Sequence, residues 1–555
     1  MLHIYKFISK PLFLLFVTLI VGGIFRLTNL STIPSGFHGD EAAYGYNAYS
    51  ILTTGTDEYG EHFPLILKSF EDYKPALYSY IDMPFVAILG LTETATRLPS
   101  ALFGTLTIPL LYYLVKELFP KEKTISILSA LLLAISPWHI MLSRSTSEVV
   151  VSLFFLLILF LSLFRLKKSF PNPWFFIAII SGSLSLATYT ASRIFVPILI
   201  IIVSLMSIQI IGKKIKFPKP IIAVFIIILM VEFAYNFVAV NNRFNQVSIF
   251  YNPLTKLRME EQIREDEFAP VLITRFFHNK IINYARTVLD NFSRYFSLDF
   301  LILNGGLPLR QRIPDVGLFY IWEIIFLFIG LFSVFLKYPK KGIILMGLWL
   351  GLLIPSAVTY DDVPNVYRAL VIVPIMVIFI SIGMKEGFRK LLSWNRYYAI
   401  VCLMILLCLS LYETLYFTHQ YVTHTKKHQP YYRDYPMKNL IYSLNTYSPK
   451  FEKIIMTKYK TSYIHILFFN KIDPHLYQAS GSNMDKDNTG FDKYLFIPKE
   501  CTLGISKEQR KEERNNNWLY VNAGFCAIPE IGVEVLKTIY WEDGNPAFQI
   551  LSYTK

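Results

Sequence analysis

Residues 11–50 read "PLFLLFVTLIVGGIFRLTNLSTIPSGFHGDEAAYGYNAYS". A predominantly apolar run, 11–30, is followed by two adjacent carboxylates, Asp40 and Glu41, and then by small residues and tyrosines. About 20 apolar residues are enough to cross a bilayer. The run lacks the small-residue cleavage site of a signal peptide, so we expect a retained membrane span with an acidic pair just outside it.

The composition indicates many such spans. Of the 555 residues, 53% are hydrophobic and only 17% are charged, whereas a soluble protein would have about a quarter charged residues. The sequence predicts a polytopic α-helical membrane protein with spans at 11–30, 98–118, 124–142, 147–165, 174–190, 194–211, 219–238, 318–336, 342–359, 366–384 and 397–416. Residues 174–211 could also form one long tilted helix instead of two.

The loops between these spans alternate in charge. One set is rich in lysine and arginine, as cytoplasmic loops are, and comprises 120–124, 165–173, 212–220, 337–341 and 385–396. The net charge of +14 lies mostly in these loops and therefore reports topology instead of nucleic-acid binding. The long loops 31–97 and 239–317 fall on the other, extracytoplasmic side. We expect a multi-pass protein of a prokaryotic plasma membrane.

The segment after the last span differs from the membrane part. It contains short apolar runs separated by polar turns, with a helical stretch near 434–446, and this alternation predicts a small extracytoplasmic α/β domain. The expected domains are a transmembrane catalytic domain, 1–416, whose outer loops carry amphipathic helices, and a C-terminal domain, 417–555. Cys501 and Cys526 could pair if this domain lies outside the cytoplasm.

Cations near the outer ends of the spans break the usual charge rule. A lone arginine there would extend to the lipid headgroups or pair with a local acid. Five from different spans favour an anion site, and the planar guanidinium suits phosphate in particular. We therefore predict a lipid-phosphate site on the outer face, formed by Lys74, Arg97, Arg144, Arg193, Arg243 and Arg368.

The acidic pair is expected at the start of a helix. In this interpretation Asp40 is the N-cap and Glu41 lies favourably in the helix dipole. Tyr46, Tyr49 and Thr53 would then share one face that lies on the membrane. A carboxylate fixed beside a phosphate site can also act as a general base.

Three elements resemble a known family. They are "GDEAAYGYNAYSILTTG" (39–55), "FEDYKPALYSYIDMPFVAILG" (70–90) and "TATRLPSALFGTLTIPLLYYLVKELF" (94–119). Their order and spacing resemble the GT-C class of membrane glycosyltransferases, above all the protein O-mannosyltransferases and the lipid A aminoarabinose transferase. "LSRSTSEVV" (142–150) is similar to a further family element, with Glu148 where aspartate is usual. The C-terminal domain shows no family motif.

The resemblance implies roles for individual residues. Asp40 would be the catalytic carboxylate that activates the acceptor, and Glu41 would orient it or contact the acceptor or sugar. Lys74 and Arg97 would bind the donor phosphate or fix the acidic pair. Tyr44, Arg144 and Glu148 would line the cavity, and the other arginines would contribute to donor binding.

The implied reaction is an inverting transfer of a sugar from a polyprenyl-phosphate donor to a protein, lipid or glycan acceptor. Fixed cations stabilise the leaving phosphate, so one carboxylate base suffices for a single displacement. No metal-ligand spacing is visible, and we expect a metal-independent enzyme without cofactors. The alternatives are a lipid-linked glycan polymerase or ligase, a lipid or anion transporter (flippase), and a binding protein without activity. A transporter predicts internal repeats and helices broken at mid-membrane.

Overall fold

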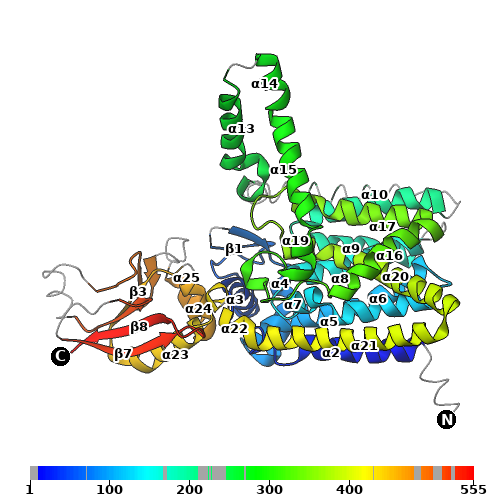
Figure 1. The fold of residues 1–555 in the computed structure, drawn as a ribbon. Coiled ribbons are helices and arrows are strands. Elements are labelled where there is room, and N and C mark those ends of the chain that lie inside the picture. Colours follow the sequence, from blue (N-terminus) through cyan, green and yellow to red (C-terminus); the bar gives the residue numbers. More distant parts are fainter. Residues whose placement is uncertain are drawn as a thin grey trace, which may run out of the picture. The chain divides into compact units, whose positions relative to one another are not determined.

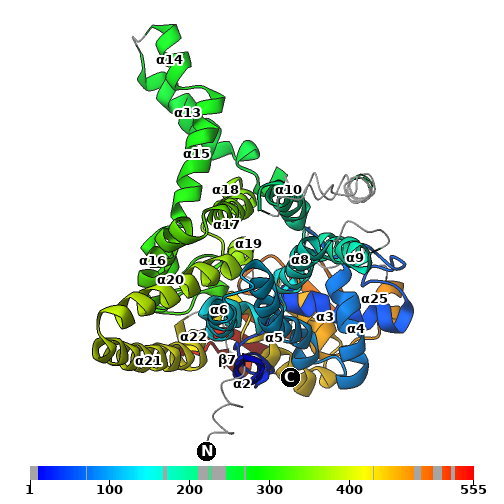
Figure 2. The same cartoon turned by 90° about the vertical axis from the view of Figure 1, so that its right-hand side faces the viewer.

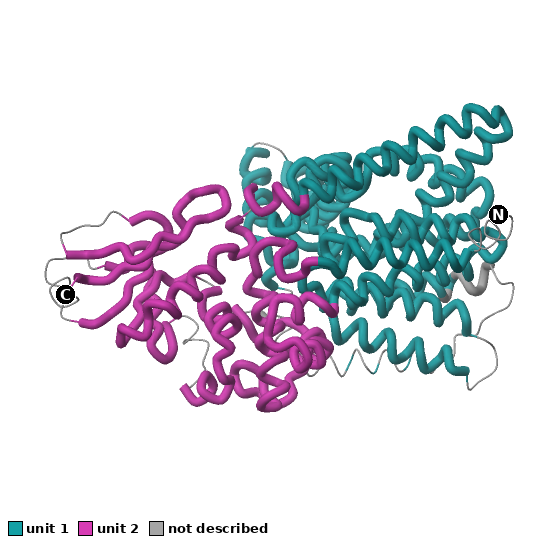
Figure 3. The backbone as a smooth tube through the Cα atoms, turned by 90° about the horizontal axis from the view of Figure 1, so that it is seen from below, with its two compact units in different colours: residues 1–28, 100–420 teal, residues 29–99, 421–555 magenta. Residues whose placement is uncertain are grey.

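A computed structural model of the chain describes residues 11–70, 72–166, 172–210, 223, 227, 230, 245–267, 270–428, 430–459, 461–480, 489–503, 516–526 and 532–554. Contacts divide the chain into two compact units, each assembled from two separate segments (Figure 3). Unit 1 comprises Met1–Thr28 and Ser100–Gln420, and unit 2 comprises Asn29–Pro99 and Tyr421–Lys555. Each is described separately below.

Unit 1 is a helical bundle (Figures 1 and 2). Its principal helices are α2 (Pro11–Leu27), α6 (Lys123–Ile135), α7 (Pro137–Ser143), α8 (Glu148–Arg165), α9 (Pro173–Thr188), α10 (Ser192–Ile210), α16 (Ile321–Lys337), α17 (Pro339–Leu352), α18 (Ile354–Ala357), α19 (Val366–Ala369), α20 (Val373–Trp394), α21 (Arg396–His419) and most of α5 (Glu93–Leu118). These helices occupy ten of the eleven predicted spans. The remaining one, 219–238, lies almost entirely outside the described residues. The break between α9 and α10 confirms two helices over 174–211.

Many of these helices are suited to a membrane. Within the described residues, five are long and apolar enough to cross one by length and composition, or six if α6 and α7 form one bent span. Small residues permit close packing, as is common between membrane helices. A Cβ atom on Gly330 of α16 would lie 1.8 Å from the Phe379 carbonyl oxygen of α20. This pair of helices could not approach so closely with a larger residue there.

The bend between α6 and α7 explains a buried arginine in the first helix. The two helices meet at 56°, at Ser136 and Pro137. Proline has no N–H, so carbonyls one turn earlier lose their helical donors. Arg26 of α2 donates to the carbonyl oxygens of Leu133 and Ala134, both at 2.8 Å. The guanidinium thus compensates for the helix break.

Part of the long loop between α10 and α16 forms a helical hairpin. Helices α13 (Pro253–Glu265), α14 (Val271–Phe277) and α15 (Lys280–Arg294) project from the bundle in both views (Figures 1 and 2). The Asn283 amide donates to the Thr255 carbonyl at 2.8 Å and links the two longer helices. The loop thus contains helices, and their expected amphipathic role at the membrane remains a prediction.

Unit 2 combines the loop that follows α2 with the C-terminal segment. From the loop come α3 (Gly39–Thr54), β1 (Ile66–Ser69), β2 (Asp72–Pro75) and α4 (Leu77–Leu89). The C-terminal segment forms a six-stranded sheet in the order β4 (Gly490–Phe491), β5 (Tyr494–Ile497), β3 (Lys453–Thr457), β6 (Trp518–Ala523), β8 (Pro546–Tyr553) and β7 (Val533–Tyr540). Strand β3 is parallel to β5 and β6, and the other pairs are antiparallel.

Three helices accompany the sheet: α23 (Met437–Tyr447), α24 (Ser462–Phe469) and α25 (Pro474–Ala479). The expected C-terminal sheet domain is therefore present. The apolar run "YIHILFF" (463–469) forms a helix and not a strand, because its side chains pack between the sheet and α3. Cys501 and Cys526 form a disulfide.

The division into units differs from the simple membrane and C-terminal halves. Residues 29–99 pack with the C-terminal segment in one hydrophobic core, which includes Ala42 and Ala43 of α3 and Ile464 and Leu467 of α24. The assignment of 1–416 and 417–555 as functional domains remains a prediction.

Candidate active site at the start of helix α3

Helix α3 begins two residues earlier than expected. Its N-cap is His38, whose Nδ1 accepts a hydrogen bond from the Asp40 N–H at 3.2 Å, while Glu41 Oε1 accepts from the His38 N–H at 3.4 Å. This reciprocal pair is a capping box. The prediction that Asp40 is the N-cap was wrong, because histidine satisfies the helix end instead. The carboxylate of Asp40 is thereby left to project from the first turn, and 42% of its side chain is exposed.

Lys74 pairs with this carboxylate. Its Nζ donates to Asp40 Oδ1 at 2.8 Å, and only 11% of the lysine side chain is exposed. The lysine lies on β2, opposite Leu67 of β1, and its ammonium also lies 5.1 Å from the ring centre of Tyr44 and 5.4 Å from that of Phe70. The two-stranded hairpin and the two rings fix the cation at the start of α3.

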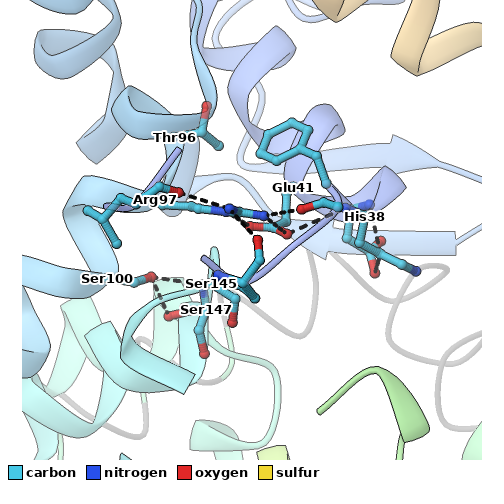
Figure 4. A network of polar contacts seen from close by, with 12 residues as sticks. His38, Glu41, Thr96, Arg97, Ser100, Ser145 and Ser147 are labelled. Atoms are coloured by element: carbon cyan, nitrogen blue, oxygen red, sulfur yellow. Dashed lines mark hydrogen bonds and ion pairs between the residues drawn. The ribbon is translucent and has the colours of Figure 1, made fainter. Parts of the chain in front are cut away.

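Arg97 binds the second carboxylate. Its Nε and Nη2 donate to Glu41 at 2.8 and 3.0 Å, and the guanidinium is fully buried (Figure 4). The remaining donors reach three backbone carbonyls of the preceding loop, those of Leu30, Pro34 and Gly36. All five N–H groups of the side chain are therefore in use. This arrangement supports the expected role of fixing the acidic pair more than direct contact with a donor phosphate.

Close packing explains the small residues that follow the acidic pair. Ala42, Ala43 and Ala48 are fully buried. A Cβ atom on Gly45 would lie 2.4 Å from the Thr96 hydroxyl oxygen, so only glycine fits there. Tyr46 does not lie on the expected membrane-facing surface, because its side chain is fully buried. Burial raises the pKa of Tyr46, and its protonated hydroxyl donates to the Ile472 carbonyl at 3.0 Å.

The other predicted cations belong to unit 1. Arg144 donates to the carbonyl oxygens of Phe25 and Thr28, both at 2.6 Å, at the end of α2. Arg368 pairs with Asp361 at 2.7 Å. Arg193 is half-buried at the start of α10, and Glu148 is half-buried in the first turn of α8. Arg243 lies outside the described residues.

The structure thus brings together one part of the predicted site. Asp40, Glu41, Tyr44, Lys74 and Arg97 meet at the start of α3 in unit 2. Arg144, Glu148, Arg193 and Arg368 lie in unit 1, and their convergence on the same phosphate remains a prediction.

Several residues that fix this site or the helices were not predicted from the sequence. His38 lies directly before "GDE", and the capping-box spacing from residue 38 to Glu41 was a signal for it, although histidine is not a usual N-cap. Arg26 lies inside an apolar run and was visible as an intramembrane charge. The contacts of Asp434 and His465 could not be read from the neighbouring sequence, because their partners Gly39 and Phe37 lie about 400 residues earlier in the chain.

The chain is similar to known membrane glycosyltransferases. Residues 73–235 match a family model described as dolichyl-phosphate-mannose-protein mannosyltransferase. No curated protein matches the chain significantly. ArnT from Cupriavidus metallidurans bound to undecaprenyl phosphate has a similar structure, with a TM-score of 0.52, 11% identity and 97% of each chain covered.

Archaeoglobus fulgidus oligosaccharyltransferase is also similar. With an acceptor peptide tethered, its structure gives a TM-score of 0.53 at 13% identity and covers 93% of this chain and 70% of that one. In its complex with Zn and sulfate the TM-score is 0.49 at 12% identity over 82% of this chain, and this chain spans 61% of that enzyme. TM-scores of 0.53 and 0.52 indicate a shared fold, and at identities of 13% and 11% the similarity extends to the fold alone. The resemblance predicted from the sequence is therefore confirmed: the chain has the fold of GT-C membrane glycosyltransferases and matches a mannosyltransferase family over residues 73–235.

Proposed function

We propose that the protein is an inverting glycosyltransferase that moves a sugar from a polyprenyl-phosphate donor to an acceptor at the extracytoplasmic face of the membrane. One observation carries this proposal: Asp40 projects, partly exposed, from the first turn of α3 with Lys74 beside it. A base and a cation within 3 Å of each other suit the two ends of a displacement at a sugar phosphate.

The reaction requires few groups. An acceptor hydroxyl or amide attacks the anomeric carbon of the sugar, and the bond from that carbon to the phosphate oxygen breaks. Asp40 takes the proton of the nucleophile, and the polyprenyl phosphate leaves with the bonding electrons. The phosphate is already a good leaving group, so no protein acid is needed, and a single displacement inverts the configuration at the anomeric carbon.

Lys74 connects the two halves of this chemistry. Paired with Asp40, the ammonium holds the carboxylate at the start of α3. A donor phosphate that attracts Lys74 would weaken this pair just when the sugar is in place, and the carboxylate could then take the proton of the acceptor. The same cation would then stabilise the charge that develops on the leaving phosphate.

Several features support the extracytoplasmic assignment. The basic loops alternate along the sequence with the loops that include the acidic pair, and with the eleven predicted spans we expect the C-terminal domain on the same side as Asp40. The Cys501–Cys526 disulfide is typical of an oxidising compartment. The plasma membrane of a prokaryote, with an oxidising compartment outside it, is consistent with the loop charges and with the disulfide. ArnT bound to undecaprenyl phosphate provides a precedent for the lipid carrier.

Sugar transfer in membranes tests the proposal. Membranes that contain the protein are incubated with radiolabelled polyprenyl-phosphate sugars, and label in protein, lipid and glycan fractions is counted. We expect label to leave the polyprenyl phosphate and appear in one of these fractions. Transfer of oligosaccharide from a polyprenyl diphosphate alone would identify a ligase or polymerase. Donor movement across the membrane without transfer would identify a transporter.

Replacing Lys74 by Met is expected to lower kcat/KM about 100-fold, because a donor that stabilises a developing anion commonly contributes that much. The affinity for undecaprenyl phosphate should also fall. Lys438→Met is the matched control, since Lys438 forms a comparable ion pair with Glu93 at 2.7 Å in the same unit. Equal losses in both variants would contradict a specific role for Lys74.

Chelation by EDTA is expected to leave the transfer rate unchanged, because lysine and arginine side chains balance the phosphate charge in this mechanism. Among the described residues, no group of three or more His, Cys, Asp or Glu side chains is placed to bind a metal ion. The test is the initial rate before and after dialysis against EDTA. A loss that Mg²⁺ or Mn²⁺ restores would mean that the donor phosphate binds together with a cation.

A further inference from the structure

The start of α3 is bonded to the C-terminal segment by an acid. The Gly39 N–H, one of the free donors at the helix start, donates to Asp434 Oδ2 at 3.0 Å. Asp434 lies between the short helix Pro430–Arg433 and α23, has a left-handed backbone (φ 51°) and is buried. Burial, the charge of Asp434 and a hydrogen bond to its carboxylate raise the pKa of Tyr459 to about 12, so the protonated hydroxyl donates to this acid.

A buried histidine fixes the preceding residue. His465 of α24 is fully buried, with Nε2 2.7 Å from the Phe37 carbonyl oxygen and Nδ1 2.7 Å from the Thr461 carbonyl oxygen. The ring therefore lies within hydrogen-bond distance of two backbone carbonyls, one on each side of it. Asp434 Oδ2 lies 3.8 Å from Nε2.

The backbone of residues 36–39 is also tightly packed against the C-terminal segment. A Cβ atom on Gly39 would lie 2.4 Å from the Thr461 methyl carbon, and one on Gly36 would lie 2.4 Å from the Arg433 carbonyl oxygen. The Phe37 ring packs against Phe468 at 4.7 Å between centres. Residues 36–39 are thus fixed by hydrogen bonds and by direct contact with the C-terminal segment.

We propose that Asp434 and His465 are positioning residues, through which the C-terminal segment sets the place of the Asp40 carboxylate. This inference rests on the proposed role of Asp40 as the base. Asp40 follows Gly39 directly, so a shift of the helix start displaces the carboxylate by the same amount. A displacement of about 1 Å between reacting groups can reduce a rate about 100-fold.

A graded series at one position tests this proposal. Asp434→Gly retains the left-handed backbone but removes the acceptor for the Gly39 N–H. Asp434→Asn retains the acceptor and removes the charge beside His465. We expect kcat to fall about 100-fold in the glycine variant and less in the asparagine variant, with the donor KM within about twofold of wild type.

Hydrogen exchange provides a measurement that does not depend on activity. In both variants the amides of residues 38–42 should exchange faster, while the six-stranded sheet keeps its protection. Asp492→Gly is the matched control, because Asp492 also has a left-handed backbone (φ 49°) and lies exposed in the turn between β4 and β5. It should change neither kcat nor exchange at 38–42.

A second pair of variants relies on space instead of hydrogen bonds. Gly39→Ala should displace the helix start against Thr461 and lower kcat. Thr461→Gly removes the opposing carbon atoms, so the double variant should recover most of the loss. This rescue tests the proposal even if Asp434→Gly does not fold.

The outcomes separate this inference from the proposed function. If wild-type protein transfers no sugar, the proposed function fails, and faster exchange confined to residues 38–42 still supports positioning of the helix start. Unchanged exchange and unchanged kcat in the Asp434 series would overturn the inference. Loss of protection throughout the sheet would do so as well, because it assigns Asp434 a general structural role.

Discussion

Replacing Asp40 by Asn is expected to reduce sugar transfer by about 1,000-fold, a typical contribution of a general base. The change leaves the helix start intact, because His38 and not Asp40 caps α3. It also releases Lys74 from its ion pair, so undecaprenyl phosphate should bind as tightly as to wild type or more tightly. The measurement is the initial rate of transfer, together with the dissociation constant of undecaprenyl phosphate for the purified protein.

The matched control for this substitution is Asp473→Asn. Asp473 also lies at a helix start in unit 2, where its carboxylate accepts from the His475 N–H at 2.9 Å at the N-cap of α25. Asparagine caps helices as well as aspartate does, so this variant should retain full activity. If Asp40→Asn matched it, the acid at residue 40 would not be the base, and the base would have to be sought elsewhere in the protein.

Local patterns in the sequence predicted much of the fold. The long apolar runs predicted the helices of unit 1, since about 20 consecutive apolar residues are typical of a helix that crosses a membrane. The acidic pair was recognised because "GDE" directly follows a span. Lys74 was a candidate because the stretch 70–90 resembles the family, and its ammonium lies 2.8 Å from the Asp40 carboxylate.

Long-range contacts could not be predicted in the same way. The partner of Arg26 is a helix break more than 100 residues later, and that of Gly39 is an acid 395 residues later. Neither contact leaves a periodic signal in the chain. Arg97 illustrates the same limit: its position suggested either a phosphate ligand or a partner for the acidic pair, and its contacts with Glu41 and three carbonyls are visible only in the folded structure.

Replacing Arg97 by Met is expected to destabilise unit 2 by about 3–5 kcal/mol. The substitution leaves the buried Glu41 carboxylate without a counterion and three carbonyls without donors, and breaking a buried ion pair from one side typically costs this much. For a unit of about 200 residues the unfolding midpoint should fall by about 10 °C. Thermal unfolding of the purified protein, followed by tryptophan fluorescence, measures this shift.

Two further variants determine whether the uncompensated charge causes the loss. Adding Glu41→Gln to Arg97→Met removes the buried charge, so the double variant should be more stable than Arg97→Met alone. Arg294→Met breaks an exposed pair with Asp290 at 2.8 Å and should cost less than about 1 kcal/mol. If Arg97→Met unfolded at the same temperature as Arg294→Met, the Arg97–Glu41 pair would be dispensable for folding. Arg97 would then be retained for a contact with the donor or acceptor.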